Sequence, residues 1–232
     1  MALATDLKEA LLHLFFPQIC PGCQSDLVNH QQLICADCMQ SLPCTGFQEM
    51  AGNPVEKLFW GRSVIQHASS IFYFIPGTPL QQIIHHIKYK NNAMLGIYMG
   101  SIMGTALKNI FSPTTIDLMI PMPLHPIKEN RRGYNQASLL CEGISDVLHI
   151  PYRNDVLIRQ FNTATQTKKS RIARWENVAD VFELHKTSSI QHKHILLIDD
   201  VITTGASTDA CAEMLLKKEA ASVSICSLAC TM

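Results

Sequence analysis

The chain has 232 residues, 47% of them hydrophobic and 16% charged, so it can bury a core and has the composition of an ordinary globular protein. Its 19 lysines and arginines balance 19 aspartates and glutamates, which argues against binding to nucleic acid or a membrane through net charge alone. The charge is uneven, however. Residues 125–175 hold nine basic and four acidic side chains, and residues 176–232 hold four basic and eight acidic ones. A basic band beside acidic residues suits an anionic ligand with a metal ion, although two solvated faces would look the same.

Residues 1–50 are predicted to form an N-terminal helix and a small zinc ribbon. The first sixteen residues read as an amphipathic helix and lack the small-residue cleavage site of a signal peptide. Two C-x-x-C pairs follow, eleven residues apart: Cys20, Cys23, Cys35 and Cys38. Four thiolates complete a tetrahedral shell with no open position, so the spacing predicts a structural Zn²⁺. A redox pair, an iron centre, or His30 in place of one thiolate are the alternatives.

The five other cysteines are scattered along the chain, which is typical of a reducing compartment and not of a secreted disulfide scaffold. We therefore expect a cytoplasmic protein. The longest uncharged run, residues 91–107, has 17 residues and begins with two asparagines, so no membrane insertion is expected.

Residues 51–232 are predicted to form an α/β domain with a mainly parallel sheet flanked by helices, in which residues 51–90 form a cap. Strands are predicted within residues 63–75, 116–120, 156–158, 181–184, 195–198 and 222–230. Helices are predicted at 137–148 and 207–219, and two more within 80–111, interrupted near residues 90–92. Strands that alternate with helices favour a parallel sheet.

Three glycines of the second predicted helix, Gly96, Gly100 and Gly104, recur every four residues and so share one face. Without side chains, this face can approach another backbone closely. We expect the helix to lie flat on the sheet. A helix dimer of the kind found in membranes is the alternative.

Two adjacent carboxylates, Asp199 and Asp200, follow the apolar strand at 195–198, where ligands of open parallel sheets bind. The loop after them would offer backbone N–H groups, hydroxyls and a helix N-terminus to a phosphate. Its residues are Thr203, Thr204, Gly205, Ala206 and Ser207. Carboxylates nearby would accept hydrogen bonds from sugar hydroxyls, so the segment predicts a clamp for a ribose 5-phosphate. A nucleotide triphosphatase is disfavoured because the chain has no G-x-x-x-x-G-K-[ST] motif, and a plain acidic turn does not account for the T-T-G that follows.

The segment LLIDDVITTGAS resembles the signature of type I phosphoribosyltransferases, which bind phosphoribosyl pyrophosphate (PRPP). Together with the cysteine pairs, IKYK, PMPLHPIKENRRGYNQ and NTATQTKKSRIARWENV, in this order, it resembles the ComF family (ComFC/GntX-like) over nearly the whole chain.

The resemblance implies that Asp199 and Asp200 hold the ribose hydroxyls of PRPP, that residues 203–207 hold its 5-phosphate, and that Mg²⁺ binds with it. The loop from Pro121 to Leu124 would meet the pyrophosphate, and Arg131 and Arg132 would meet that same group or another anion. A basic stretch occupies the place of a loop that closes over the reacting centre, and a solvated loop without this role is the alternative. Its cations are Lys168, Lys169, Arg171 and Arg174. The catalytic residues would be Lys168, Arg171 and the two aspartates.

Three functions follow from the resemblance. The first is transfer of phosphoribose to an acceptor that no pattern in residues 51–90 identifies. The second is binding of single-stranded DNA or of a protein of the DNA-uptake machinery in natural competence. The third is a PRPP sensor that docks a partner through its zinc unit.

Overall fold

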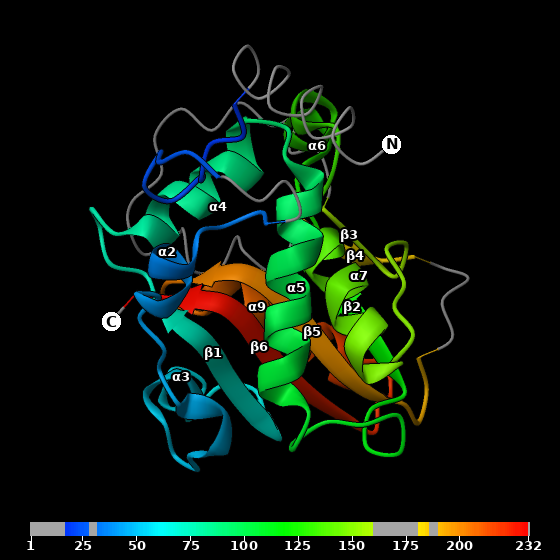
Figure 1. Cartoon of the computed structure of the whole chain (residues 1–232). Helices are drawn as coiled ribbons and strands as arrows, with labels where there is room; N and C mark the ends of the chain where they lie inside the picture. The colour runs from blue at the N-terminus through cyan, green and yellow to red at the C-terminus, as the bar shows by residue number, and fades with distance from the viewer. Residues whose placement is uncertain (1–16, 28–31, 160–180, 186–189, 232) are drawn as a thin grey trace, which may run out of the picture.

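The computed structural model describes residues 17–27, 32–159, 181–185 and 190–231 (Figure 1). The predicted first helix, His30, and the basic stretch from Lys168 to Arg174 lie outside the described residues. Within the described part, every helix is too short or too polar to span a bilayer.

Four parallel strands form the central sheet in the order β1 (His67–Tyr73), β6 (Ser222–Cys230), β5 (His194–Ile202) and β2 (Leu118–Pro121). The predicted parallel α/β sheet is confirmed. The central strand β6 is buried along almost its whole length, as a parallel strand covered on both faces requires. In the register, Pro121 at the end of β2 lies opposite Ile198, so β5 continues beyond its neighbour. The acid pair therefore lies at an open corner of the sheet.

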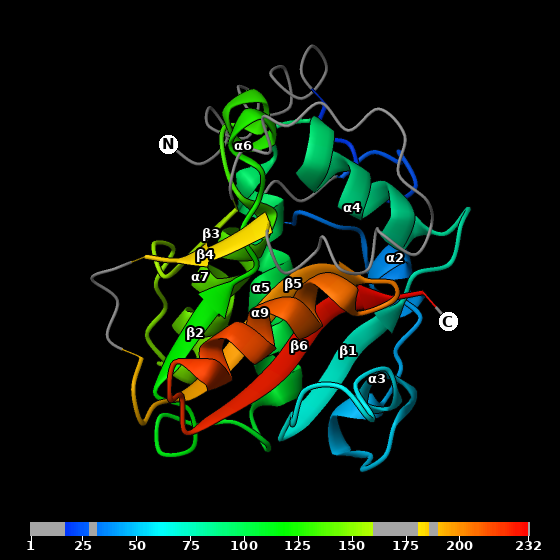
Figure 2. The same cartoon turned by 180° about the vertical axis from the view of Figure 1, so that it is seen from behind.

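Helices cover both faces of this sheet (Figures 1 and 2). On one face lie α5 (Ala93–Leu107) and α7 (Gln136–Leu148), which pack in one core with Met119 and Leu196. On the other face lie α9 (Ala206–Lys217) and the short α3 (Pro54–Lys57), with the alternate sheet residues. The predicted strands β3 (Leu157–Arg159) and β4 (Phe182–Leu184) pair antiparallel with each other and form a separate ribbon.

The glycine stripe of α5 packs against helix α7 and not directly on the sheet, contrary to the sequence prediction. A Cβ atom placed on Gly100 would overlap the backbone carbonyl of Leu140, and one on Gly104 would lie 2.9 Å from Cβ of Val147. Gly143 of α7 meets the backbone of α5 in the same way. The stripe is thus used inside the fold, where it lets the two helices approach until backbone meets backbone.

Helix α4 (Pro79–Tyr89) lies beyond the carboxyl end of β5 (Figures 1 and 2). Its apolar residues recur at helical spacing and are buried: Leu80, Ile83, Ile84 and Ile87. Asn91 then adopts a left-handed conformation, and the side chain of Asn92 caps α5 by accepting a hydrogen bond from the N–H of Leu95. The predicted interruption between the two helices is confirmed.

Four short helices or turns were not predicted from the sequence. They are α2 (Ala36–Gln40), the 3₁₀ turn Phe47–Glu49, α3 (Pro54–Lys57) and α6 (Pro126–Arg132). Each is too short to show an apolar period. Helix α6 begins with a proline in its first turn and ends at Gly133 in the left-handed conformation, which is a common arrangement at helix ends.

Candidate functional site

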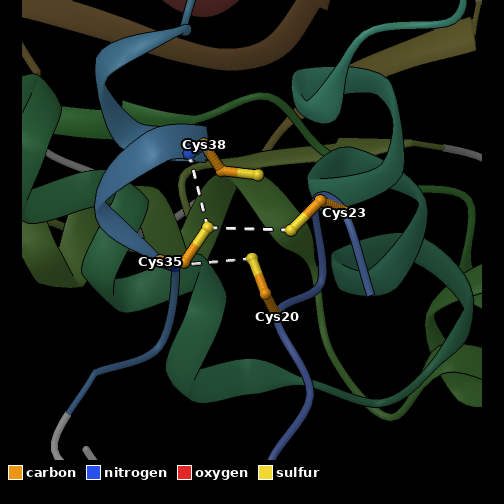
Figure 3. A group of neighbouring side chains, drawn as sticks. All are labelled: Cys20, Cys23, Cys35 and Cys38. Atoms are coloured by element: carbon orange, nitrogen blue, oxygen red, sulfur yellow. Dashed lines mark hydrogen bonds between the residues drawn. The ribbon is translucent and has the colours of Figure 1, made fainter. Parts of the chain in front are cut away.

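The four cysteines of the two C-x-x-C pairs converge on one point (Figure 3). Their Sγ atoms all lie within 4.8 Å of one another, and those of Cys23 and Cys35 are 3.7 Å apart. Two backbone N–H groups also point at sulfur, from Cys35 to Cys20 Sγ and from Cys38 to Cys35 Sγ, each at 3.4 Å. The turn between Cys20 and Cys23 requires a glycine at position 22, because a Cβ atom there would lie 2.8 Å from the Sγ of Cys38.

This donor set fits a tetrahedral zinc ion. Zinc–sulfur bonds of about 2.3 Å place two ligands of a regular tetrahedron about 3.8 Å apart, close to the observed separation of Cys23 and Cys35. The serine at position 25 lowers the pKa of Cys23 to about 6 through hydrogen bonds to its sulfur, whereas burial raises the pKa of Cys38. Because a bound cation favours the thiolate, zinc would ionise all four together.

The acid pair lies in the last part of β5, where the strand has passed the end of β2. Oδ1 of Asp199 accepts a hydrogen bond from the N–H of Asp200 at 2.8 Å, and Oδ1 of Asp200 accepts one from the N–H of Val201 at 2.7 Å. Burial, together with the charge of Asp200, raises the pKa of Asp199 to about 7. The two carboxylates therefore lie in a site that disfavours two negative charges in the absence of a ligand.

Lys88, near the end of α4, forms an ion pair with one member of the acid pair. Its Nζ lies 2.7 Å from Oδ2 of Asp200, and both side chains are only about one fifth exposed. The ammonium thus occupies a position beside the carboxylate that a sugar hydroxyl could take. It is also the first lysine of the IKYK segment, for which we predicted no role in the site from the sequence.

A cavity of about 220 Å³ opens at the acid pair, and we call it the clamp cavity. It is bounded by residues 122–124, which follow β2, by the first residues of α7, and by Asp199 and Asp200. Among the described residues, four cations line it: Lys88, Lys128, Arg132 and Arg159. Three nitrogens here have no hydrogen-bond partner among the described residues: Arg132 Nε, Gln136 Nε2 and Arg159 Nε. An anionic ligand would give buried donors of this kind a partner.

A smaller cavity of about 80 Å³ lies beside it and is lined by Asp199 and residues 201–208. Here Gly205 adopts the left-handed conformation with φ of 72° and begins α9 without a side chain to cap it. Phe59 packs against this turn, 3.2 Å from the position a Cβ atom of Gly205 would take. The loop therefore exposes the backbone N–H groups of a helix start, which suits a phosphate.

The segment RRGYNQ joins these parts together. Arg132 donates from Nη1 to Oε1 of Gln136 at 2.6 Å, and the hydroxyl of Tyr134 donates to the carbonyl of Ile87 in α4 at 2.8 Å. Asn135 caps α7 through the N–H of Ala137 and donates from its amide to the carbonyl of Met122 at 2.9 Å. One segment thus connects α4, α7 and the loop after β2.

The structure brings most of the predicted site residues together around these two cavities. Residues 203–207 line the smaller cavity, and Arg132 and both aspartates line the clamp cavity. Pro121 is buried in β2, and the three residues after it line the clamp cavity. Arg131 lines a third, adjoining cavity. Lys168 and Arg171 lie outside the described residues, but Arg159 and Phe182, on either side of that stretch, both line the clamp cavity.

Sequence reasoning missed five polar residues of the clamp cavity. They are Lys88, Lys128, Asn135, Gln136 and Arg159. Four of them belong to segments that carried the family resemblance, IKYK and PMPLHPIKENRRGYNQ, so a signal was present without an assigned role. Arg159 had none, because it depends on the β3–β4 ribbon.

Comparison with known proteins agrees with this geometry. Residues 135–231 match the phosphoribosyl transferase domain. The chain is 28% identical to the DNA utilization protein YhgH of Escherichia coli (strain K12), over 92% of this chain and 85% of that protein. It is 28% identical to competence protein F of Haemophilus influenzae, over 89% of this chain and 87% of that protein. It is also 32% identical to competence protein ComFC of Bacillus subtilis (strain 168), over 62% of this chain and 57% of that protein. The resemblance to the ComF family is confirmed.

Proposed function

We propose that this chain, a ComF-type protein with a phosphoribosyl transferase domain in residues 135–231, binds PRPP with Mg²⁺ and transfers its phosphoribosyl group to a nitrogen acceptor. The observation that carries the proposal is the grouping of an acid pair, a phosphate-type loop and four cations around adjoining cavities. A diphosphate needs the cations, a ribose needs hydrogen-bond acceptors, and a 5-phosphate needs the loop.

In this assignment, residues 203–207 bind the 5-phosphate, and Asp199 and Asp200 accept hydrogen bonds from the ribose hydroxyls. The cations at Lys88, Lys128, Arg132 and Arg159 face the pyrophosphate. Lys88 would leave Asp200 as the sugar arrives, since both compete for the same carboxylate. Lys168 and Arg171 are proposed to approach from the stretch between Arg159 and Phe182.

The reaction would exchange one bond at C1 of the ribose for another. The lone pair of the acceptor nitrogen forms a bond to C1 while the C1–O bond breaks, and pyrophosphate leaves with that electron pair. An acceptor nitrogen that carries a proton then loses it to water, whereas a pyridine nitrogen keeps the positive charge. No side-chain base is required, and the cations lower the barrier by meeting the charge that develops on the leaving group. Mg²⁺ bound together with PRPP would supply further positive charge to the leaving group.

The four-cysteine site is proposed to hold a structural Zn²⁺. Its four sulfur ligands leave no position for water or substrate, and two of its cysteines are buried in the main core. None of the nine cysteines, all of which lie in the described residues, forms a disulfide, which supports a reducing compartment such as the cytoplasm.

A second candidate function is the handling of single-stranded DNA during uptake. The names of the relatives, competence protein and DNA utilization protein, favour it. So does the exposed cation-rich surface beside the clamp cavity, which includes Arg131 and Tyr89. It predicts binding that weakens steeply with salt, because binding would release counterions from phosphates.

Titration calorimetry with PRPP, with and without Mg²⁺, tests the first proposal. We expect magnesium-dependent binding to the natural chain and a loss of at least about a hundredfold in affinity in Asp199→Asn/Asp200→Asn, since both hydroxyl contacts lose their charge. The double variant Asp146→Asn/Asp155→Asn is the matched control, because it removes two acids from exposed positions outside both cavities. Unchanged PRPP affinity in Asp199→Asn/Asp200→Asn would refute the assignment of the clamp.

A further inference from the structure

A third cavity adjoins the clamp cavity, and its walls differ in chemistry. It has a volume of about 480 Å³, within the usual range for small-molecule sites, and shares Lys88 and Arg132 with the clamp cavity. Its other lining residues are Tyr89, Asn91, Asn130, Arg131 and Gly133. It is thus built from the end of α4 and the end of α6.

The charge of this cavity is positive. Three of its lining side chains are cations, and none of those in the described part is an acid. Lys88 directs its ammonium to Asp200, whereas Arg131 forms no ion pair or hydrogen bond within the described residues. A free guanidinium in such a site selects an anion.

The shape and the amides of the cavity indicate which kind of anion. The guanidinium of Arg132 lies over the ring of Tyr89, 5.2 Å from its centroid, so one wall is planar. A planar guanidinium matches a planar carboxylate through two parallel hydrogen bonds. Asn91 and Asn130 each carry an amide, which can both donate to and accept from the edge of a heterocycle.

We infer that this cavity is the acceptor site, and that it takes a flat nitrogen heterocycle bearing a carboxylate, which Arg131 recognises. The inference rests on the proposed function, because an acceptor has meaning only beside bound PRPP. The position supports it. A ligand here is separated by Lys88 from Asp200, where the ribose would lie. Arg131, expected from the family resemblance to meet pyrophosphate or another anion, is therefore assigned to the acceptor.

Two matched ligand pairs test the inference. Orotate and uracil differ by one carboxylate, and nicotinate and nicotinamide differ by the replacement of a carboxylate with an amide. Each is titrated into the protein saturated with PRPP and Mg²⁺, and pyrophosphate release is followed. We expect the carboxylated member of at least one pair to bind about tenfold more tightly than its neutral partner. Equal binding within both pairs, or no binding by any of the four, would overturn the inference.

The variant Arg131→Gln identifies the residue responsible. It should abolish the preference for the carboxylate and leave the Kd for PRPP within about twofold of the natural chain. Lys108→Gln is the control, since it removes one exposed cation from the end of α5, outside all three cavities. If Arg131→Gln weakens PRPP binding as well, Arg131 belongs to the PRPP site and the inference is wrong.

Two further outcomes separate the competing explanations. Failure of the natural chain to bind PRPP overturns the proposed function. The pairs are then titrated into the free protein, where an Arg131-dependent preference would retain the cavity as a carboxylate site without transfer. An oligothymidylate that binds more tightly than every carboxylate, and loses its binding in Arg131→Gln, would assign the cavity to nucleic acid and overturn the acceptor role.

Discussion

At the residue scale, the acid pair that is proposed to bind the ribose also lowers the stability of the free protein when both carboxylates are ionised. The pKa of Asp199 is raised from 3.8 to about 7 by burial and by the charge of Asp200. Between these two values the folded protein keeps a proton that the unfolded chain has released. The free energy of unfolding therefore falls as the pH rises from about 4 to about 7.

This fall in stability with rising pH leads to a prediction for Asp199→Asn. The variant keeps a hydrogen-bond acceptor for the N–H of Asp200 but cannot ionise. We expect the variant to be more stable than the natural chain at about pH 8 and nearly equal to it at about pH 5, where Asp199 is protonated. Thermal unfolding at the two pH values measures this.

The control is Glu213→Gln, which alters an exposed acid of α9 paired with Lys217 and should change stability by less than about 0.5 kcal/mol. A loss of stability in Asp199→Asn at both pH values would show that its carboxylate stabilises the free protein.

The residues of the clamp divide into those that local sequence predicts and those that it does not. Asp199, Asp200 and residues 203–207 are contiguous, and their chemistry is visible without a fold. Lys88 and Arg159 reach the same cavity from α4 and from the β3–β4 ribbon, far along the chain. Only tertiary packing brings them there, so no local pattern could assign their role.

At the element scale, the pair α5–α7 depends on the absence of side chains at a few positions. Helix propensity alone predicts that Gly100→Ala stabilises the chain by about 1 kcal/mol. The overlap of a Cβ atom with the backbone of Leu140 predicts the opposite, a loss of about 1–3 kcal/mol, because neither backbone can move freely. We expect the loss, measured by denaturant unfolding.

Met94→Ala on the same helix is the control for this variant. Its side chain is 62% exposed, so the change should lie within about 0.5 kcal/mol. If Gly100→Ala stabilises the protein, the close approach of α5 and α7 is not present in solution.

The cysteine unit is a second element whose stability can be tested. Cys35→Ser should release the metal and lower the stability of the chain, because the remaining three thiolates no longer complete the shell. Zinc content after gel filtration and the unfolding temperature measure both effects. Cys44→Ser is the matched control, since Cys44 is exposed and lies outside the four-sulfur group. One zinc tightly held in Cys35→Ser would show that the ligand set is wrong.

The sequence predicts helices best where they are long. Helices α4, α5, α7 and α9 have 11 to 15 residues and were predicted, whereas α2, α3 and α6 have at most seven residues and show no apolar period. The glycine spacing indicated a close approach correctly, but the partner was a helix and not the sheet. The spacing of the glycines predicts that another backbone approaches closely, but it does not identify that backbone.

At the scale of the whole molecule, α4 joins the two sites that the sequence presents as separate units. Pro79, its first residue, lies 3.1 Å from the position of a Cβ atom on Gly22 in the cysteine knuckle. Leu80 shares a core with Cys20 and Cys38. The other end of the helix carries Lys88, which pairs with Asp200. Eleven helical residues, about 16 Å of rigid backbone, thus connect the metal site to the clamp.

Removal of the metal should therefore weaken PRPP binding at the clamp. We expect a chelator that strips the cysteine site to weaken magnesium-dependent PRPP binding by about five- to tenfold, because α4 then loses the support that fixes Lys88. Calorimetry on metal-loaded and stripped protein measures it, and restored affinity after zinc is added back excludes irreversible damage. The effect should shrink in Lys88→Met. Equal affinities with and without zinc would show that the two sites are independent.

The same helix has a consequence for the metal. Because coupling between two binding equilibria is reciprocal, PRPP must strengthen the hold on zinc by the factor with which zinc strengthens the hold on PRPP. Protein with an occupied clamp would then keep its zinc against a competing chelator that empties the free protein. The fraction of protein that retains its zinc would then depend on the PRPP concentration around it.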